Sequence, residues 1–296
     1  MESPANCLQE KFIEDLTEQL FPPRQRSEVQ KLCFQLRFHP INWNDKHGQI
    51  ADKISKKLND GFSKLSINST VTDVVKKVKD KFEVQMRADG VDTEKLIRVQ
   101  QGTPSASEES PWELVYKWLW EKEFPRRGWE FSKEMAIYAD EKMQMEPLFM
   151  EEDCRDLDFS DNLDIGERTI QKGKEYRLQL NLQQSGYLLL INQGVSGSKY
   201  GICPSWRYHP DGQLLSSIPM AVPNEKGLAN FLRYNAVGDE YFLAIVTEQP
   251  LKLSWARPNS KPNDIAINEG RLHEIFKQVG QQQNCQVFYK TFEVID

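Results

Sequence analysis

The chain has 296 residues, with 39% hydrophobic residues, 28% charged residues and a formal net charge of −6. This length favours two domains, and the hydrophobic content, with 15 Phe, 9 Tyr and 7 Trp, excludes a wholly disordered chain. No stretch approaches about 18 consecutive apolar residues, so we expect no membrane span and no membrane partner. The N-terminus lacks the basic and apolar regions of a secretory signal, which favours a cytoplasmic protein.

The five cysteines are scattered along the chain, at positions 7, 33, 154, 203 and 285, and none forms a C-x-x-C pair. We therefore expect free thiols rather than a disulfide framework. The charge is uneven as well. Residues 101–167 carry 7 Lys and Arg against 18 Asp and Glu, a net charge of −11, whereas the flanking regions are nearly neutral. This acidic centre argues against a nucleic-acid partner.

Residues 1–99 predict a helical domain, because their apolar side chains recur at helical spacing. The stripe Leu8, Phe12, Leu16 and Leu20 predicts a first helix that the prolines of "FPPR" end. Further stripes predict a second helix (Val29, Leu32, Cys33, Leu36) and a third (Ile50, Ile54, Leu58) that stops at Gly61.

The stretch "NSTVTDVVKKVKDKF" predicts a fourth helix, with Thr70 and Asp73 as a capping box. Residues 92–99 suggest a short last helix. The Ser-, Pro- and Glu-rich segment 100–111 then predicts a flexible linker.

Residues 112–164 predict a connector that is first aromatic and helical and then acidic. Two helices are expected here, in "WELVYKWLWEKEF" and "FSKEMAIYADEKMQM". The large aromatic side chains of the first are expected to pack onto a neighbouring domain rather than to form a ligand site.

From residue 165 to 296 the apolar period changes from 3.6 to 2, which predicts a β domain, an antiparallel sandwich or barrel. Alternation in "KEYRLQLNL" and the apolar run "GYLLLINQ" predict two strands, and "ANFLRYN", "EYFLAIVTE", "LKLSW" and "CQVFYKTFEVI" predict others. One helix is expected in "RLHEIFKQVG". The predicted fold class is therefore α+β.

No phosphate-binding glycine loop, G-x-S-x-G elbow or H-E-x-x-H motif occurs, so we expect neither a cofactor nor a metal. Cys203 and His209 are a thiol and an imidazole six positions apart. Catalytic pairs usually meet from distant positions, and these two are expected to lie along one extended strand as structural residues. Between them, Trp206, Arg207 and Tyr208 form a candidate recognition edge.

Two lysine clusters lie opposite apolar stripes, one at positions 53, 56 and 57 and the other at 76, 77, 79 and 81. Solvated helix faces explain such clusters in general. A partner could nevertheless reach them, and we take Arg24, Arg26, Lys53, Lys56 and Lys57 as candidate partner-binding residues.

The N-terminal pattern "FPPRQRSEVQKLCFQLRFHPINW", followed by "IADKISKKLNDG" and "TVTDVVKKV", resembles the bacterial effector-associated domains, which are small death-like helical adaptors. The resemblance covers about a third of the chain. It implies a helical bundle without catalysis that docks onto a matching domain, on an effector such as a caspase-like or trypsin-like protease in bacterial conflict and signalling systems.

Residues 186–192 and 238–251 resemble an uncharacterised β domain that often lies C-terminal to bacterial caspase-like proteases and kinases. Here no protease or kinase domain accompanies it. These resemblances imply a non-enzymatic adaptor or regulatory protein. Two alternatives stay open: a cysteine hydrolase using Cys203 and His209 or a proteolytic substrate cut within 100–111, and a nucleic-acid or carbohydrate binder that uses aromatic side chains of the β domain.

Overall fold

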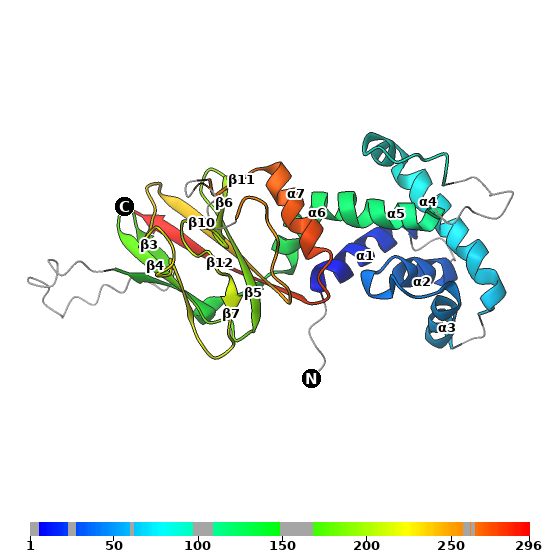
Figure 1. Cartoon of the computed structure of the whole chain (residues 1–296), viewed down its shortest axis with the longest axis horizontal. Helices are drawn as coiled ribbons and strands as arrows, with labels where there is room; N and C mark the ends of the chain where they lie inside the picture. The colour runs from blue at the N-terminus through cyan, green and yellow to red at the C-terminus, as the bar shows by residue number, and fades with distance from the viewer. Residues whose placement is uncertain are drawn as a thin grey trace, which may run out of the picture. The chain divides into compact units, whose positions relative to one another are not determined.

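The computed structural model describes residues 6–22, 28–59, 62–96, 109–148, 168–256, 261 and 264–296. The chain divides into two compact units, which we call the helical unit, Asn6–Phe131, and the β unit, Ser132–Asp296. Figure 1 shows helices throughout the first unit and strands in most of the second. The predicted α+β class is confirmed at this level, with helices followed by largely antiparallel sheets.

This division differs from the one drawn from the sequence, which placed a linker at 100–111 and a separate connector at 112–164. Residues 111–131 belong to the helical unit, since their aromatic side chains contribute to its core. Residues 137–138 and 143–147 belong to the β unit, since their backbones pair with its strands. Most of the predicted linker, 100–108, and the acidic stretch 149–164 lie outside the described residues.

The described part of the helical unit is built mainly of α-helices. They are α1 (Cys7–Leu20), α2 (Glu28–Arg37), α3 (His47–Leu58), α4 (Ile67–Ala88), α5 (Pro111–Trp118) and α6 (Phe124–Met135), which runs into the β unit. Short 3-10 turns occur at Pro40–Asn42 and Lys64–Ser66, and a π-helical segment, Leu119–Glu123, joins α5 to α6.

Helix α1 forms as its sequence predicts. The Asn6 side-chain oxygen accepts hydrogen bonds from the amides of Leu8 (3.2 Å) and Gln9 (3.3 Å), which satisfies two amides that no helical carbonyl can reach. The predicted stripe is buried: Leu8, Phe12, Leu16 and Leu20. Helix α3 ends with Asn59 in the left-handed conformation, whereas the expected stop, Gly61, lies outside the described residues.

The start predicted for α4 is wrong. The helix begins at Ile67, and Thr70 lies within its first turn with its hydroxyl donating to the Ser66 carbonyl (2.9 Å). Thr70 and Asp73 therefore form no capping box. The expected helix at 92–99 is wrong over its described part, because residues 93–96 form a turn.

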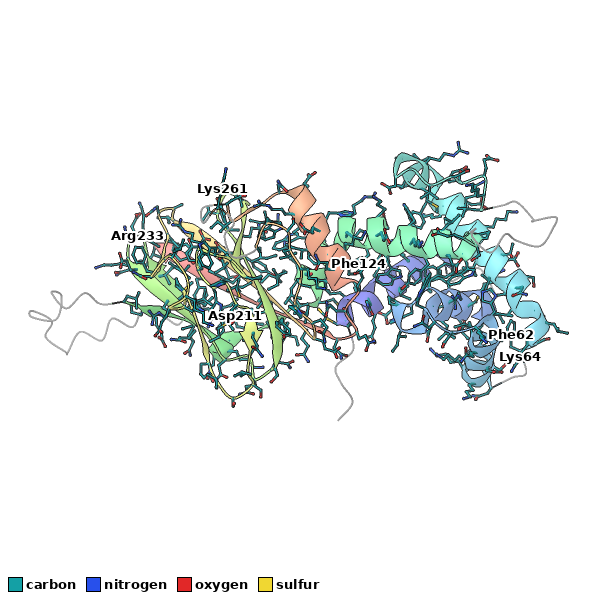
Figure 2. All side chains as sticks on the ribbon, viewed as in Figure 1. Phe62, Lys64, Phe124, Asp211, Arg233 and Lys261 are labelled. Carbon is teal, nitrogen blue, oxygen red and sulfur yellow. The ribbon has the colours of Figure 1, made fainter. Side chains whose placement is uncertain are left out.

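The aromatic side chains of residues 112–124 pack within the helical unit. The Phe12 ring lies 5.0 Å from the Trp120 ring and 5.3 Å from that of Phe124 (labelled in Figure 2), measured between centroids. The indole nitrogen of Trp120 also donates to the Phe38 carbonyl at the end of α2 (2.9 Å). Trp120 and Phe124 thus pack onto the helices of residues 1–99, as the sequence predicts, and the two segments form one unit rather than a domain and a separate connector.

The β unit contains two sheets and a helix. The larger sheet runs β1 (Ile137–Tyr138), β12 (Cys285–Ile295), β10 (Gly238–Thr247), β5 (Gly186–Gln193), β6 (Lys199–Cys203) and β11 (Ala266–Ile267), with β3 (Thr169–Gln171) beside β12 and β7 (Gln213–Leu214) beside β5. The smaller sheet runs β2 (Met143–Pro147), β4 (Glu175–Leu180) and β8 (Met220–Val222), with β9 (Leu232–Arg233) beside β4. Helix α7 spans Glu269–Val279.

Side chains from both sheets share one hydrophobic core, among them Leu178 of β4, Leu190 of β5 and Phe242 of β10. The alternating pattern of β4 buries every second residue, as predicted. Two expectations are wrong. The helix expected in residues 131–145 ends at Met135, because the following backbone pairs with β12 and β4. Residues 251–255 form no strand, and the strand expected in residues 229–235 is only Leu232–Arg233.

Candidate functional site

The lysines proposed for partner binding differ in their surroundings. Lys53 is held within the helical unit, because its ammonium group lies 2.6 Å from the Asp45 carboxylate and 2.6 Å from the Asn42 side-chain oxygen. Lys56 and Lys57 are exposed in the last turn of α3 and form no ion pair with a described residue. These two therefore remain available to a partner.

The other candidate residues of the helical unit are Arg24 and Arg26, and a further exposed residue is Leu65. Arg24 and Arg26 lie outside the described residues, so their part in partner binding stays a prediction. Between α3 and α4, in the segment where Figure 2 labels Phe62 and Lys64, Leu65 is 93% exposed. An exposed leucine can supply apolar area to an interface.

The segment 199–213 does not form the single extended strand expected from its sequence. Strand β6 ends at Cys203, a cis peptide bond follows to Pro204, and the chain then reverses. Ser205 and His209 pair across this reversal through two backbone hydrogen bonds of 2.8 and 3.1 Å. Cys203 and His209 therefore lie on opposite sides of a tight turn.

The Cys203 thiol is part of the core and not of an exposed site. It donates to the Leu188 carbonyl, with 3.7 Å between Sγ and the oxygen. Burial raises the pKa of this thiol, which disfavours the thiolate that a nucleophile requires. Burial lowers the pKa of His209, so its imidazole is neutral near pH 7. No feature of this geometry supports a thiol–imidazole pair.

The candidate recognition edge is only half exposed. Trp206, Arg207 and Tyr208 are all partly buried, and their backbone carbonyls accept hydrogen bonds from the loop after β8. The Leu228 amide donates to the Trp206 carbonyl (3.4 Å), and the Ala229 amide donates to the Arg207 carbonyl (2.8 Å). The Asn224 amide donates to the Tyr208 carbonyl (3.0 Å). The segment is thus held in place by a neighbouring loop, and cavities lie on either side of it.

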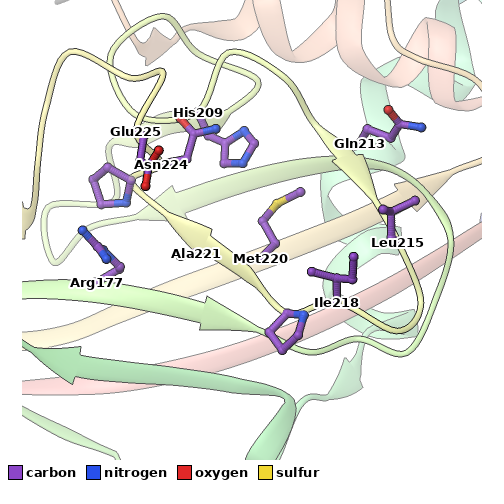
Figure 3. A pocket seen from close by; sticks show the side chains of 11 residues that line it. Arg177, His209, Gln213, Leu215, Ile218, Met220, Ala221, Asn224 and Glu225 are labelled. Atoms are coloured by element: carbon purple, nitrogen blue, oxygen red, sulfur yellow. The ribbon is translucent and has the colours of Figure 1, made fainter.

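The first cavity, of about 350 Å³, lies beside His209 (Figure 3). Its lining residues come from β4, from the turn after β6, from β7 and from the segment around β8: Arg177, His209, Gln213, Leu215, Ile218, Pro219, Met220, Ala221, Pro223, Asn224 and Glu225. In Figure 3, Arg177, His209, Asn224 and Glu225 gather at one end, and Leu215 and Ile218 lie at the other, with Gln213 beside Leu215. The cavity therefore has a charged end and a largely apolar end.

The second cavity, of about 420 Å³, is lined in part by Tyr208 and contains a buried carboxyl group, that of Glu240. The Asn192 amide donates to Glu240 Oε2 (2.9 Å), and the Val195 amide also supplies a hydrogen bond. Burial outweighs these bonds and raises the pKa of Glu240. Because the Glu240 carboxyl group is already hydrogen-bonded within the β unit, its burial does not require a ligand.

The described ranges hold no cluster of three or more His, Cys, Asp or Glu side chains that could bind a metal ion. No helix in them is both long enough and apolar enough to cross a bilayer.

Comparison with family models, with curated proteins and with solved structures gave no match to this chain. Its function must therefore be argued from its own residues. Sequence reasoning missed Arg177, Leu215 and Ile218. Arg177 occupies a polar position in the alternating pattern of β4, so it reads as an ordinary solvent-facing residue, and its meeting with His209 depends on the tertiary fold.

Proposed function

We propose that this protein is a non-enzymatic adaptor or regulatory protein of a bacterial conflict or signalling system. Its helical unit acts as a death-like bundle that recruits an effector carrying a matching domain, with a caspase-like or trypsin-like protease as the expected effector. Its β unit, which we take to be a sandwich, binds a second partner.

The proposal depends on the two unpaired lysines at the end of α3. A lysine near a helix C-terminus is favourable in any helix, because it complements the helix dipole by roughly 0.3–1 kcal/mol, so its presence alone needs no partner. Lys56 and Lys57, however, have no carboxylate partner among the described residues, whereas Lys53 on the same helix has one. Together with exposed Leu65, they supply the charge and apolar area that docking of a small domain requires.

The organisation of the chain supports the same proposal. The residues that resemble an effector-associated domain lie in the helical unit, which is compact and has its own core. A unit of this kind can present a docking surface independently of the rest of the chain. Within the described residues of the resembling segments, Lys53 is engaged by Asp45 and the Cys33 side chain is buried.

The test is co-precipitation of the full-length protein with effector candidates encoded beside its gene, each expressed with its own helical domain. The double variant Lys56→Glu with Lys57→Glu should weaken capture at least about tenfold and reduce its salt dependence, since charge pairs steer such contacts. The matched control is Lys76→Glu with Lys81→Glu, two exposed lysines of α4 that form no ion pair with a described residue.

The outcomes separate a specific docking face from a general effect of charge. Capture that is lost in the α3 variant and kept in the α4 variant supports the proposal. Equal capture by the wild type and the α3 variant excludes this face, and an equal loss in both variants shows that only the total charge matters. Candidates without a helical domain should not be captured at all.

A further inference from the structure

The cavity beside His209 contains two buried nitrogen atoms that the rest of the β unit does not satisfy. Arg177 Nε and His209 Nδ1 are both buried without a hydrogen-bond partner among the described residues, and His209 as a whole is only 6% exposed. A buried polar group left without a partner costs about 1–3 kcal/mol, so such groups in folded proteins generally bind water, an ion or a ligand. Both residues line the same cavity.

The charged side chains that act on the His209 ring are Asp211 and Lys226, which pair with each other (3.3 Å), and Arg177 has no ion pair among the described residues. Arg177 lies opposite Glu146 in the pairing of β4 with β2, but the Glu146 carboxylate accepts its hydrogen bond from Gln179 (2.9 Å). Glu225 lines the cavity as well, and it is exposed and forms no ion pair within the described part of the chain. Within the described part of the β unit, the guanidinium charge of Arg177 is therefore not neutralised by an ion pair.

The opposite end of the cavity is largely apolar and open to solvent. Leu215 is 50% exposed and Ile218 is 58% exposed, although most large apolar side chains of the β unit are buried in its core. Met220 and Pro219 continue this wall. A volume of about 350 Å³ is within the range of about 300–1,000 Å³ that small-ligand pockets occupy.

We propose that this cavity binds an aliphatic carboxylate, with the carboxylate at Arg177 and His209 and the hydrocarbon part against Leu215 and Ile218. Arginine favours this group, because its planar donors match the two oxygens of a carboxylate. A neutral imidazole adds one further N–H donor without adding charge. The same chemistry occurs in a free short-chain acid and in the C-terminal residue of a peptide that ends in an apolar side chain. The proposal concerns the β unit alone and does not depend on recruitment by the helical unit.

The experiment is titration of the full-length protein, followed by the chemical shifts of the β-unit amides in NMR. The probes are hexanoate, N-acetyl-leucine and the tripeptide acetyl-Ala-Ala-Leu, with hexanol, acetate and the tripeptide amide as controls. Hexanoate and N-acetyl-leucine should shift amides around His209 and Met220, and acetate or hexanol should bind at least about tenfold more weakly, since each lacks one half of the recognised group. Tighter binding of the tripeptide than of its amide identifies a peptide terminus as the source, and equal binding of tripeptide and hexanoate identifies the shared chemistry alone.

Three variants decide the assignment. Arg177→Gln should weaken hexanoate binding at least about tenfold, and the control Arg233→Gln, on neighbouring β9, should leave it unchanged. Glu225→Gln removes a negative charge from the cavity and should tighten binding a few-fold, which tests the site without touching the buried residues. The proposal is overturned if hexanoate causes no shifts, if acetate binds as well as hexanoate, or if Glu225→Gln weakens binding.

Discussion

The guanidinium carbon of Arg37 lies 3.4 Å from the ring centre of Trp112, so that a buried cation of α2 stacks on an aromatic ring of α5. Arg37 is only 1% exposed, and it also donates to the backbone carbonyls of Asp45 (2.7 Å), Asn42 (3.4 Å) and Trp43 (3.4 Å). One side chain thus joins two helices, α2 and α5, to the turn before α3. Burial lowers its pKa, but an arginine keeps its charge at any physiological pH.

Replacing Arg37 by Met should destabilise the helical unit by about 2–4 kcal/mol, because three carbonyls, one of them buried and two partly buried, lose their donor and the stacking contact is lost. Urea unfolding followed by tryptophan fluorescence measures this, since five of the seven tryptophans lie between residues 43 and 129. The control is Arg87→Met on α4, whose side chain forms an exposed ion pair with Glu83 and a hydrogen bond to the Thr93 hydroxyl (3.0 Å), so its loss should destabilise the unit less. Equal losses in the two variants would contradict the role assigned to Arg37.

Asp89, which follows α4, gives the helical unit an acid-dependent contribution to stability. Burial alone would raise the pKa of this carboxyl group, but hydrogen bonds from Arg126 (2.8 Å) and from the Trp118 indole (2.8 Å) outweigh it and lower the pKa. A lowered pKa in the folded state means that the stabilisation is complete above the unfolded value of about 3.9 and is lost as the pH falls through the folded value.

We therefore expect the free energy of unfolding of the helical unit to fall with acidification below about pH 4, and Asp89→Asn to flatten that dependence and lower the stability at pH 7. Urea titrations between pH 2 and 7 measure both effects. Asp80→Asn, an exposed position on α4, is the control and should keep the wild-type pH profile. An unchanged acid limb in Asp89→Asn would show that other carboxylates produce it.

The Cys203 thiol should be unreactive in the folded protein. Because burial raises its pKa and its proton is donated to the Leu188 carbonyl, alkylation by iodoacetamide at pH 8 should be at least about a hundredfold slower than in urea. Mass spectrometry of the labelled peptides measures the rate at this residue. Rapid labelling of Cys203 in the native protein would revive the cysteine-hydrolase hypothesis, and Cys203→Ala would then have to abolish any peptidase activity found.

The sequence predicted correctly those helices and strands whose buried side chains recur every two to four residues. The stripe of α1 and the alternation of β4 each follow from neighbours two to four positions apart, and the structure confirms both. The error at residues 143–147 has the opposite origin. Met143 and Met145 suit a helix as well as a strand, and only pairing with Leu180 and Leu178, more than thirty residues away, makes this segment a strand.

The candidate site was harder to predict for the same reason. His209 stood out in the sequence because Cys203 is near it, yet the Cys203 thiol is buried and donates to the Leu188 carbonyl. Arg177 lies 32 positions before His209, and the cavity that unites them exists because β4, the turn after β6 and the segment around β8 converge. A single sequence carries no local signal for that convergence. That Arg177 lacks an ion pair among the described residues is likewise visible only in the three-dimensional structure.

Gly227, in the loop after β8, packs closely against the turn that follows β6. A Cβ atom on residue 227 would lie 2.4 Å from the Tyr208 carbonyl oxygen and 3.0 Å from the Arg207 carbonyl oxygen. Gly227→Ala should therefore push the loop after β8 away from the turn and destabilise the β unit by about 1–3 kcal/mol. Hydrogen exchange of the amides of Asn224 and Ala229, which bond to the turn, should accelerate. The control is Gly270→Ala in α7, where the added methyl group meets only Asn268 Oδ1 at an ordinary 3.5 Å and should stabilise the helix by about 0.5–1 kcal/mol.

Because the same turn carries His209, Gly227→Ala should also weaken hexanoate binding. A variant with fast exchange but unchanged binding would show that the turn does not form the cavity.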